Sequence, residues 1–197
     1  IGTNNQIFSL DPTLESIRLG KSFAIKNSIS NVSFVRADIF DDVFYPESID
    51  VVLCSGVLHH TKNPKKGFKI ICKYVKKNGT IIVGLYNRYG RLRTYVRGFF
   101  YKIFGDRFLR FADPVLRKMD PNGDKKKINS WIRDQYTHPV ESTHSFDEIL
   151  GWFKENNIEF VNSYPSCEIS ADNNCDYFEK RSVGKKLERI IQQVSMI

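Results

Sequence analysis

The sequence predicts an α/β fold in which the strands of a mostly parallel sheet alternate with helices. Four short apolar runs occur in order along the first half of the chain, and the segments between them carry apolar residues at helical spacing. Strands that alternate with helices of about 10–15 residues are typical of parallel sheets with crossover helices. Apolar residues make up 41% of the 197 residues and charged residues 26%, a balance typical of a folded domain.

The first predicted strand covers Gln6–Leu10 and is followed by Asp11 and Pro12. Proline is favoured in the first turn of a helix, so we expect Pro12 to begin a helix that ends near Lys26. Apolar residues at rough helical spacing support that helix: Leu14, Ile17, Leu19 and Phe23.

Three further strands are predicted before residue 87. Residues 31–38 alternate apolar and polar side chains, which is typical of a strand. The continuous apolar run Ile49–Cys54 predicts a strand that is covered on both faces. Pro64 then begins a helix, and Thr80–Leu85 forms the last apolar run of this series. The apolar side of that helix is expected to hold Phe68, Ile71 and Val75.

Residues 88–144 break this rhythm, and we expect a helical insertion after the fifth strand of the complete sheet. Ser145 is predicted to cap the next helix while Glu148 reaches back to the cap. A strand at Ile158–Tyr164 and a helix at Gly184–Val194 are expected to follow. Within the insertion, a first helix carries an apolar stripe of Leu92, Val96, Phe99 and Ile103.

The insertion also carries the charge imbalance of the chain. The formal net charge is +8, and the segment Arg88–Lys127 holds twelve basic and four acidic residues, so the rest is neutral. Three interpretations are open for this segment: a solvated lid, a membrane-surface helix, or a contact for an anionic or nucleic-acid ligand. Because Phe99, Phe100 and Phe104 have the spacing of a buried stripe, we do not expect a nucleic-acid partner.

Other classes of protein are disfavoured by what the sequence lacks. No apolar run approaches the roughly 20 residues that span a bilayer. The four cysteines show no CxxC spacing, so we expect reduced thiols in a cytoplasmic protein. His138, Glu141 and His144 resemble a metal-binding set, but Pro139 breaks the helical register that would align them, so we expect no metal.

Polar residues follow each predicted strand. The first strand ends on Asp11 and the second on Asp38, while the third runs into "CSGVLHHT" and the fourth into "LYNRYGR". In open parallel sheets, ligands bind beyond the carboxyl ends of the strands. We therefore expect two carboxylates, a histidine pair and a Tyr-Asn pair at one edge of the sheet.

These strand ends resemble class I S-adenosylmethionine-dependent methyltransferases, and most closely the bacterial type 11/12-like branch. The resemblance is carried by "FSLDPTLESIRLGK", "VSFVRADIFD" and the stretch from "SIDVVLCSGVLHHT" to "GLYN". It implies a Rossmann-like three-layer sandwich, S-adenosylmethionine as cofactor and a small-molecule acceptor. In that family a Gly-rich turn lies about twenty residues before the ribose-binding acid. Only ten residues precede Asp11, so we expect this chain to lack the first strand and that turn, and also a final strand.

The resemblance also implies roles for individual residues. Asp11 would accept hydrogen bonds from the ribose hydroxyls, Asp38 would accept from the adenine amino group, and Ile39 would pack on the adenine ring. Ser55 is expected to border the cofactor. His60, or else His59, is the candidate general base, because histidine titrates near neutral pH. Substrate contacts are expected from Tyr86, Asn87, Tyr136 and His138.

Simpler interpretations of the same residues stay open. Asp11 is also suited to capping the following helix, Asp38 to a turn, and the histidine pair to an ordinary loop. At the level of function, a non-catalytic remnant would bind a partner, an anionic ligand or a membrane surface through residues 88–127. A nicotinamide-dependent dehydrogenase is disfavoured because its glycine fingerprint is absent.

Overall fold

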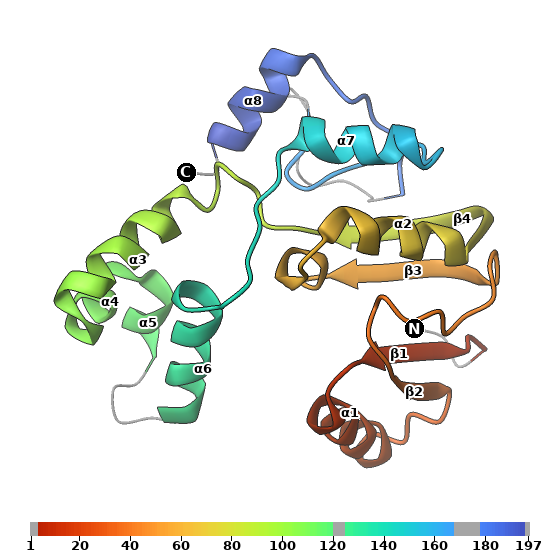
Figure 1. Ribbon diagram of the computed structural model, residues 1–197, viewed down its shortest axis with the longest axis horizontal. Coiled ribbons are helices and arrows are strands. Elements are labelled where there is room, and N and C mark those ends of the chain that lie inside the picture. Colours follow the sequence, from red (N-terminus) through yellow and green to blue (C-terminus); the bar gives the residue numbers. More distant parts are fainter. Residues whose placement is uncertain (1–3, 120–124, 168–177, 196–197) are drawn as a thin grey trace. The chain divides into compact units, whose positions relative to one another are not determined.

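The computed structural model describes residues 4–119, 125–167 and 178–195 (Figure 1). The chain forms two compact units. The first unit comprises residues 1–53 and 65–82, and the second comprises residues 54–64 and 83–197. The chain therefore passes from the first unit to the second and back before it completes the second.

The first unit begins with the strand–helix–strand arrangement that the sequence predicts. Strands β1 (Ile7–Asp11) and β2 (Val32–Arg36) pair in parallel, with Asp11 opposite Arg36. Helix α1 (Leu14–Lys26) connects them. Pro12 was predicted to begin this helix, and that is wrong by two residues. Thr13 is the N-cap instead, because its hydroxyl accepts a hydrogen bond from the backbone N–H of Ser16.

Strands β3 (Ile49–Ser55) and β4 (Val75–Gly84) form a second pair, with helix α2 (Pro64–Tyr74) between them in sequence. The N–H of Ser48 donates to the carbonyl of Tyr74, and that of Gly56 to the carbonyl of Gly84. Pairing therefore advances in the same direction along both strands, so β3 and β4 are parallel, as predicted. The described residues contain two two-stranded sheets, however, where the sequence predicted a single sheet.

Strand β4 begins five residues earlier than expected, directly after α2. Asn78 has a positive φ of 62°, which marks a local distortion inside the strand. The next residue must be glycine, because a Cβ atom at Gly79 would lie 2.7 Å from the backbone oxygen of Asp50.

Strand β3 is not covered on both faces, and that prediction is wrong. Val51 is 54% exposed and Leu53 69% exposed, whereas Cys54 is buried. Among the described residues, one side of this strand is therefore covered and the other faces solvent. The buried side of α2 supplies packing through three side chains: Phe68, Ile71 and Tyr74. Val75, predicted on the same helix face, is the first residue of β4.

The second unit is mostly helical. It begins with the 3-10 turn η1 (Leu58–His60), and helices follow after residue 91. A core of Leu109, Leu116 and Ile128 holds the predicted insertion together, and Trp131 and Tyr136 pack against it. The helices of the insertion are α3 (Leu92–Phe104), α4 (Asp106–Ala112), α5 (Pro114–Lys118) and α6 (Lys125–Tyr136).

The apolar stripe of α3 does not pack inside the protein, which contradicts the prediction of a buried stripe. Its members are exposed by about half or more of their surface, and so is Phe104. Gly98 and Tyr101 form the packed side instead: a Cβ atom at Gly98 would lie 3.6 Å from the ring of Tyr136, and Tyr101 packs on the helical core. Gly98 and Tyr101, rather than the residues of the stripe, therefore face the other helices.

Helix α7 (Phe146–Glu155) begins as predicted, since the Ser145 hydroxyl accepts from the N–H of Glu148. The Glu148 carboxylate does not reach back to the cap, because it accepts from His144 and Arg88. The strand predicted at 158–164 is absent from the described residues, and that prediction is wrong. Among the described residues, the segment makes one backbone bond to the end of α7, from Ile158 to Phe153, and one from Arg181 to Val161, which is too little for a strand pairing.

The last helix, α8, covers Lys186–Val194, two residues shorter at its start than predicted. Gln193 is fully buried and joins this helix to the rest of the second unit. Its Oε1 accepts from the Asn87 side chain and from the backbone N–H of Phe146. Helix α8 is therefore held in place partly through polar contacts.

Candidate functional site

Two carboxylates follow the carboxyl ends of β1 and β2 in the first unit. Asp11 is the last residue of β1, and its Oδ1 accepts from the N–H of Thr13 at 2.8 Å and from the Thr13 hydroxyl at 2.6 Å. Asp11 thus shapes the turn into α1 without capping the helix itself. Its Oδ2 has no hydrogen-bond partner among the described residues, so it remains able to accept from a ligand.

Asp38 lies two residues beyond the end of β2 and is exposed. Its Oδ1 accepts from the N–H of Phe40 at 3.0 Å, and its own N–H donates to Asp41. Because Asp11 is opposite Arg36 in the parallel pair, Asp11 and Asp38 occupy the same edge of this sheet. Ile39, half-buried, comes next in the chain. Two acceptors at adjacent strand ends fit a nucleoside, which offers a ribose diol and an amino group.

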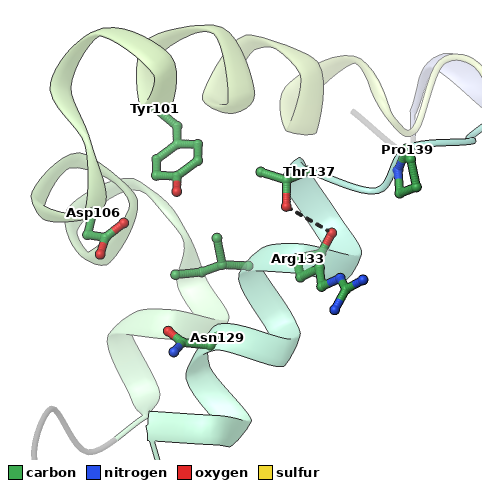
Figure 2. Close-up of a pocket in the computed structure, with 7 residues that line it drawn as sticks. Tyr101, Asp106, Asn129, Arg133, Thr137 and Pro139 are labelled. Carbon is green, nitrogen blue, oxygen red and sulfur yellow. Dashed lines mark hydrogen bonds between the residues drawn. The ribbon is translucent and has the colours of Figure 1, made fainter.

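A polar pocket of about 360 Å³ lies in the second unit between α3 and α6 (Figure 2). Figure 2 shows Tyr101 and Asp106 on one side and Asn129 and Arg133 on the other. Thr137 and Pro139 complete the lining on the turn after α6. A pocket of this size accommodates a small polar molecule.

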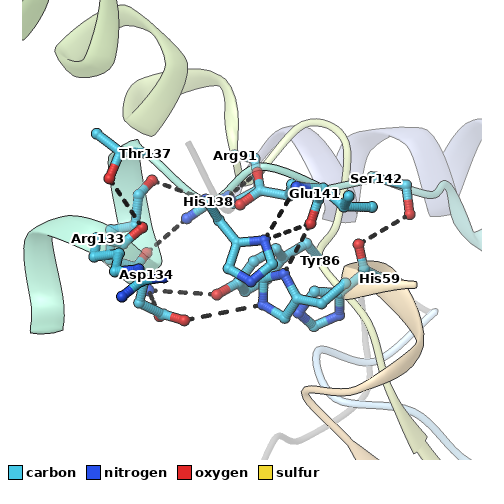
Figure 3. Close-up of polar contacts among 12 residues, drawn as sticks. His59, Tyr86, Arg91, Arg133, Asp134, Thr137, His138, Glu141 and Ser142 are labelled. Carbon is cyan, nitrogen blue, oxygen red and sulfur yellow. Dashed lines mark hydrogen bonds and ion pairs between the residues drawn. The ribbon is translucent and has the colours of Figure 1, made fainter. Parts of the chain in front are cut away.

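The same turn contributes to a cluster of aromatic and imidazole rings (Figure 3). His59 stacks on Tyr86, with ring centroids 3.8 Å apart and planes inclined by 27°. His59 is 2% exposed, and neither ring nitrogen has a hydrogen-bond partner among the described residues. Burial, followed by the neighbouring His60, lowers the pKa of His59 to about 4. The ring is therefore neutral at physiological pH.

His60 and His138 lie side by side, with ring centroids 4.0 Å apart. Nδ1 of each ring lies within hydrogen-bond distance of the Val140 carbonyl, at 3.2 Å from His60 and 2.6 Å from His138. A carbonyl only accepts, so a neutral His60 carries its proton on Nδ1, and Nε2 holds the lone pair. At His138, Nδ1 also lies 3.3 Å from the backbone N–H of Val140, which can donate to it. Nε2 of His60 lies 3.9 Å from Oδ1 of Asp134.

Arg91 holds this cluster to the segment that follows α6. Its guanidinium donates to the Glu141 carboxylate at 2.6 and 3.2 Å, and to the side chain and backbone of Gln135. The same group lies over the Tyr86 ring, 4.1 Å from the centroid. Arg91 is buried, and a buried charge needs an oppositely charged partner, which Glu141 provides. Arg91 was not predicted as a site residue, although it is the last residue of the "LYNRYGR" motif.

Tyr86 is fixed on both faces and at its hydroxyl, which accepts from the Gln135 amide at 3.3 Å. Burial raises the pKa of the Tyr86 phenol, so this hydroxyl stays protonated. Four of the residues singled out from the sequence therefore meet in the second unit: His59, His60, Tyr86 and His138.

Other predicted residues have different partners. The Tyr136 hydroxyl donates to Asp113 at 2.6 Å within the helical core, and burial raises its pKa to about 12. The Asn87 side chain shapes its own turn by accepting from the backbone of Tyr89 and Gly90. Ser55 is exposed at the end of β3. The polar atoms of Tyr136 and Asn87 therefore have partners within the protein.

The histidines and the glutamate of "HPVESTH" do not converge. Glu141 pairs with Arg91, and His144 lies between Ser142 and Glu148. Across the described ranges, no group of three or more histidine, cysteine, aspartate or glutamate residues is placed to hold a metal ion.

Comparisons with known proteins agree with the fold. A family model described as a methyltransferase domain matches residues 1–135. A curated protein of Bacillus subtilis (strain 168), described as the uncharacterized methyltransferase YcgJ, is 23% identical over 78 residues. That match covers 40% of this chain and 31% of the relative.

The structure is also similar to PKMT2 from Rickettsia typhi. The complex of that protein with AdoHcy gives a TM-score of 0.59 at 18% identity. The structure of PKMT2 alone gives a TM-score of 0.60 at the same identity. Both matches cover 77% of this chain and 33% of PKMT2. The chain thus spans about a third of the length of these proteins, and at this identity the likeness shows the fold.

Proposed function

The chain belongs to the methyltransferase domain family, since the family model covers more than half of it, and on this premise we propose that it transfers a methyl group from S-adenosylmethionine to a small-molecule acceptor. Family membership confirms the resemblance found in the sequence. The observation that carries the proposal is the pair of carboxylates, Asp11 and Asp38, at one edge of the parallel pair β1–β2.

The first unit supplies the residues proposed to hold the nucleoside. Oδ2 of Asp11 would accept from the ribose hydroxyls, because Oδ1 is already engaged by Thr13. Asp38 would accept from the adenine amino group, and the half-buried Ile39 would pack on the ring. From the second unit we retain Ser55, exposed at the end of β3, as a further cofactor contact.

The second unit supplies the residues proposed for the acceptor. S-adenosylmethionine brings a methyl group already activated by a sulfonium, so the protein contributes mainly position and, where needed, a base. His60 is that base in our proposal: Nδ1 donates to Val140, which leaves the Nε2 lone pair to accept a proton from an acceptor O–H or N–H. Oδ1 of Asp134 lies 3.9 Å from that nitrogen.

The remaining residues of the ring cluster position rather than react. His59 is too weak a base, with its pKa near 4, to take a proton at neutral pH. His138, which lies beside His60, would contact the acceptor. Tyr86 carries His59 on one face and the Arg91 guanidinium on the other, so it would position these groups. Tyr136 and Asn87 are not part of this proposal, because their polar groups are used inside the protein.

The second unit also contains a pocket that is large enough for a small molecule; it is lined by Tyr101, Asp106 and Arg133 among others, and by none of the residues of the ring cluster. Its volume of about 360 Å³ lies in the range of about 300–1,000 Å³ typical of small-molecule sites. We infer that residues 88–144 form the lid or pocket region, with Arg91 and Glu141 fixing its end. The free thiols Cys54, Cys72 and Cys167 support a reducing, cytoplasmic environment.

Binding of AdoHcy and of NAD to the full-length gene product tests this function by calorimetry. The proposal predicts that AdoHcy binds and NAD does not. Failure to bind AdoHcy would overturn it, and binding of NAD would favour a dehydrogenase. Turnover is then measured as AdoHcy release from S-adenosylmethionine with a panel of small alcohols, phenols and amines.

A further inference from the structure

Helix α3 turns an apolar stripe toward solvent. Leu92, Val96, Phe99 and Ile103 are separated by four, three and four residues, so they share one side of the helix. They are 50%, 49%, 62% and 58% exposed, respectively. The side that packs on the other helices carries Gly98 and Tyr101. An amphipathic helix of a globular protein normally buries its apolar side, and this helix does the opposite.

Basic residues flank the stripe on both sides. At 100° per residue, Arg93 and Lys102 stand about a quarter turn from the stripe on opposite sides, and Arg97 lies farther round next to Arg93. The sequence from Arg88 to Gly105 contains no acidic residue. A hollow of about 300 Å³ is lined by both kinds of side chain: Leu92, Arg93, Val96 and Arg97.

The same character continues into α4. Phe111 is 79% exposed, and Arg107 and Arg110 of this helix are exposed too. The acidic residue Asp106 stands alone among these basic residues in α4. The surface formed by α3 and α4, which we call the basic apolar face, therefore combines exposed rings and aliphatic side chains with positive charge.

We propose that the basic apolar face binds the surface of a bilayer that contains anionic phospholipids, with α3 lying in the plane of the interface. Apolar side chains of such a helix enter the boundary between headgroups and acyl chains, and flanking lysine and arginine side chains reach the anionic headgroups. Among the described residues no helix is long and apolar enough to cross a membrane, and binding in the plane needs none.

Two other partners fit the face less well. A nucleic acid would use the positive charge but gain nothing from exposed Leu92, Val96 and Ile103. A second copy of the chain, paired through the same face, would cover the apolar side chains but bring the arginines of both copies together, which is unfavourable. An anionic bilayer matches both the charge and the apolar surface.

Vesicle flotation with the full-length gene product tests this proposal. Vesicles of phosphatidylcholine with about 30 mol% phosphatidylglycerol should bind the protein, and pure phosphatidylcholine should bind it much more weakly. The double variant Phe99→Glu/Ile103→Glu should lower the partition coefficient at least about tenfold. Arg93→Gln/Lys102→Gln, which removes the exposed basic residue on each side of the stripe, should lower it about 20- to 30-fold, since each basic residue contributes about fivefold.

Matched variants separate the face from general effects. Phe178 is 65% exposed outside the face, so Phe178→Glu should leave partitioning unchanged. Lys69→Gln/Lys77→Gln removes the same charge as Arg93→Gln/Lys102→Gln and should lower partitioning far less. Equal loss in the matched variants, or equal binding to neutral vesicles, would overturn the proposal. A dimer in light scattering that Phe99→Glu abolishes, without vesicle binding, would assign the face to a second copy instead.

Discussion

The imidazole of His59 stacks on the ring of Tyr86 at 3.8 Å, yet both of its nitrogens are buried without a hydrogen-bond partner in the part of the chain that the structure describes. A buried polar atom that lacks a partner costs about 1–3 kcal/mol. A stacked carbon ring would fill the same place without that cost. A histidine here is therefore a cost to stability, which points to a role in function rather than in packing.

Replacing His59 by phenylalanine tests that interpretation. His59→Phe should raise the free energy of unfolding by about 1 kcal/mol, because the stacking on Tyr86 is kept and two unsatisfied nitrogens are removed. The same variant should lower methyl transfer. Chemical denaturation and turnover measure the two effects. A variant that is both less stable and fully active would contradict a functional role for His59.

The pH dependence of stability provides a separate test of His59. Its pKa is lowered from about 6.5 to about 4 in the folded protein, so between these values the unfolded chain binds the proton and the folded chain does not. Stability should therefore fall as pH falls from about 6.5 toward 4, by up to about 1.4 kcal/mol per pH unit. The difference between wild type and His59→Phe isolates this contribution from the carboxylates. A difference that does not change with pH would show that His59 titrates normally.

His60 is predicted to act in turnover and not in cofactor binding. His60→Gln keeps a hydrogen-bond donor for the Val140 carbonyl but lacks a base, so turnover should fall by about 10²–10⁴-fold. The affinity for AdoHcy should stay within a factor of two or so of the wild-type value, since the nucleoside contacts are elsewhere. Turnover is measured with the first acceptor that reacts. Near wild-type turnover in His60→Gln would exclude general-base catalysis by this residue.

The ion pair between Arg91 and Glu141 is expected to be a strong stabilising contact. Their side chains are 8% and 13% exposed, so Glu141→Ala would leave a buried guanidinium partly unpaired. The expected loss is about 3 kcal/mol in the free energy of unfolding. The exposed pair Lys76–Asp50 is the comparison, and Lys76→Ala should cost about 1 kcal/mol or less. Equal losses of stability from the two substitutions in chemical denaturation would contradict a strong contribution from the Arg91–Glu141 ion pair.

Sequence patterns predicted the local elements of the first unit well. Apolar periodicity and chain order predicted strands β1 and β2, helix α1 and the two strand-end carboxylates. These patterns are set by residues close together in the sequence, so they can be recognised without the tertiary structure. The segment 158–164 shows the limit of that method. Its apolar residues favour a strand, but a strand also needs a partner, and in the described residues this segment makes one backbone bond to Arg181.

The candidate site in the second unit was predictable only in part. The motif "GVLHHT" led to His59 and His60, but nothing in it distinguishes the buried ring from the one that contacts Val140. Arg91 and Glu141 are fifty residues apart, and their pairing depends on tertiary structure that spacing does not encode. Likewise, helical periodicity identified the α3 stripe without showing that it faces outward.

The nucleoside role of Asp11 is the central claim, and titration calorimetry with AdoHcy tests it most directly. In the full-length gene product, Asp11→Ala should weaken AdoHcy binding by about 1–3 kcal/mol, the value of a lost charge-assisted hydrogen bond. Asp50→Ala removes an exposed aspartate of β3 that pairs with Lys76, and it should leave the affinity unchanged. Unchanged affinity in Asp11→Ala, with wild type binding normally, would contradict the assignment of Asp11 to the ribose.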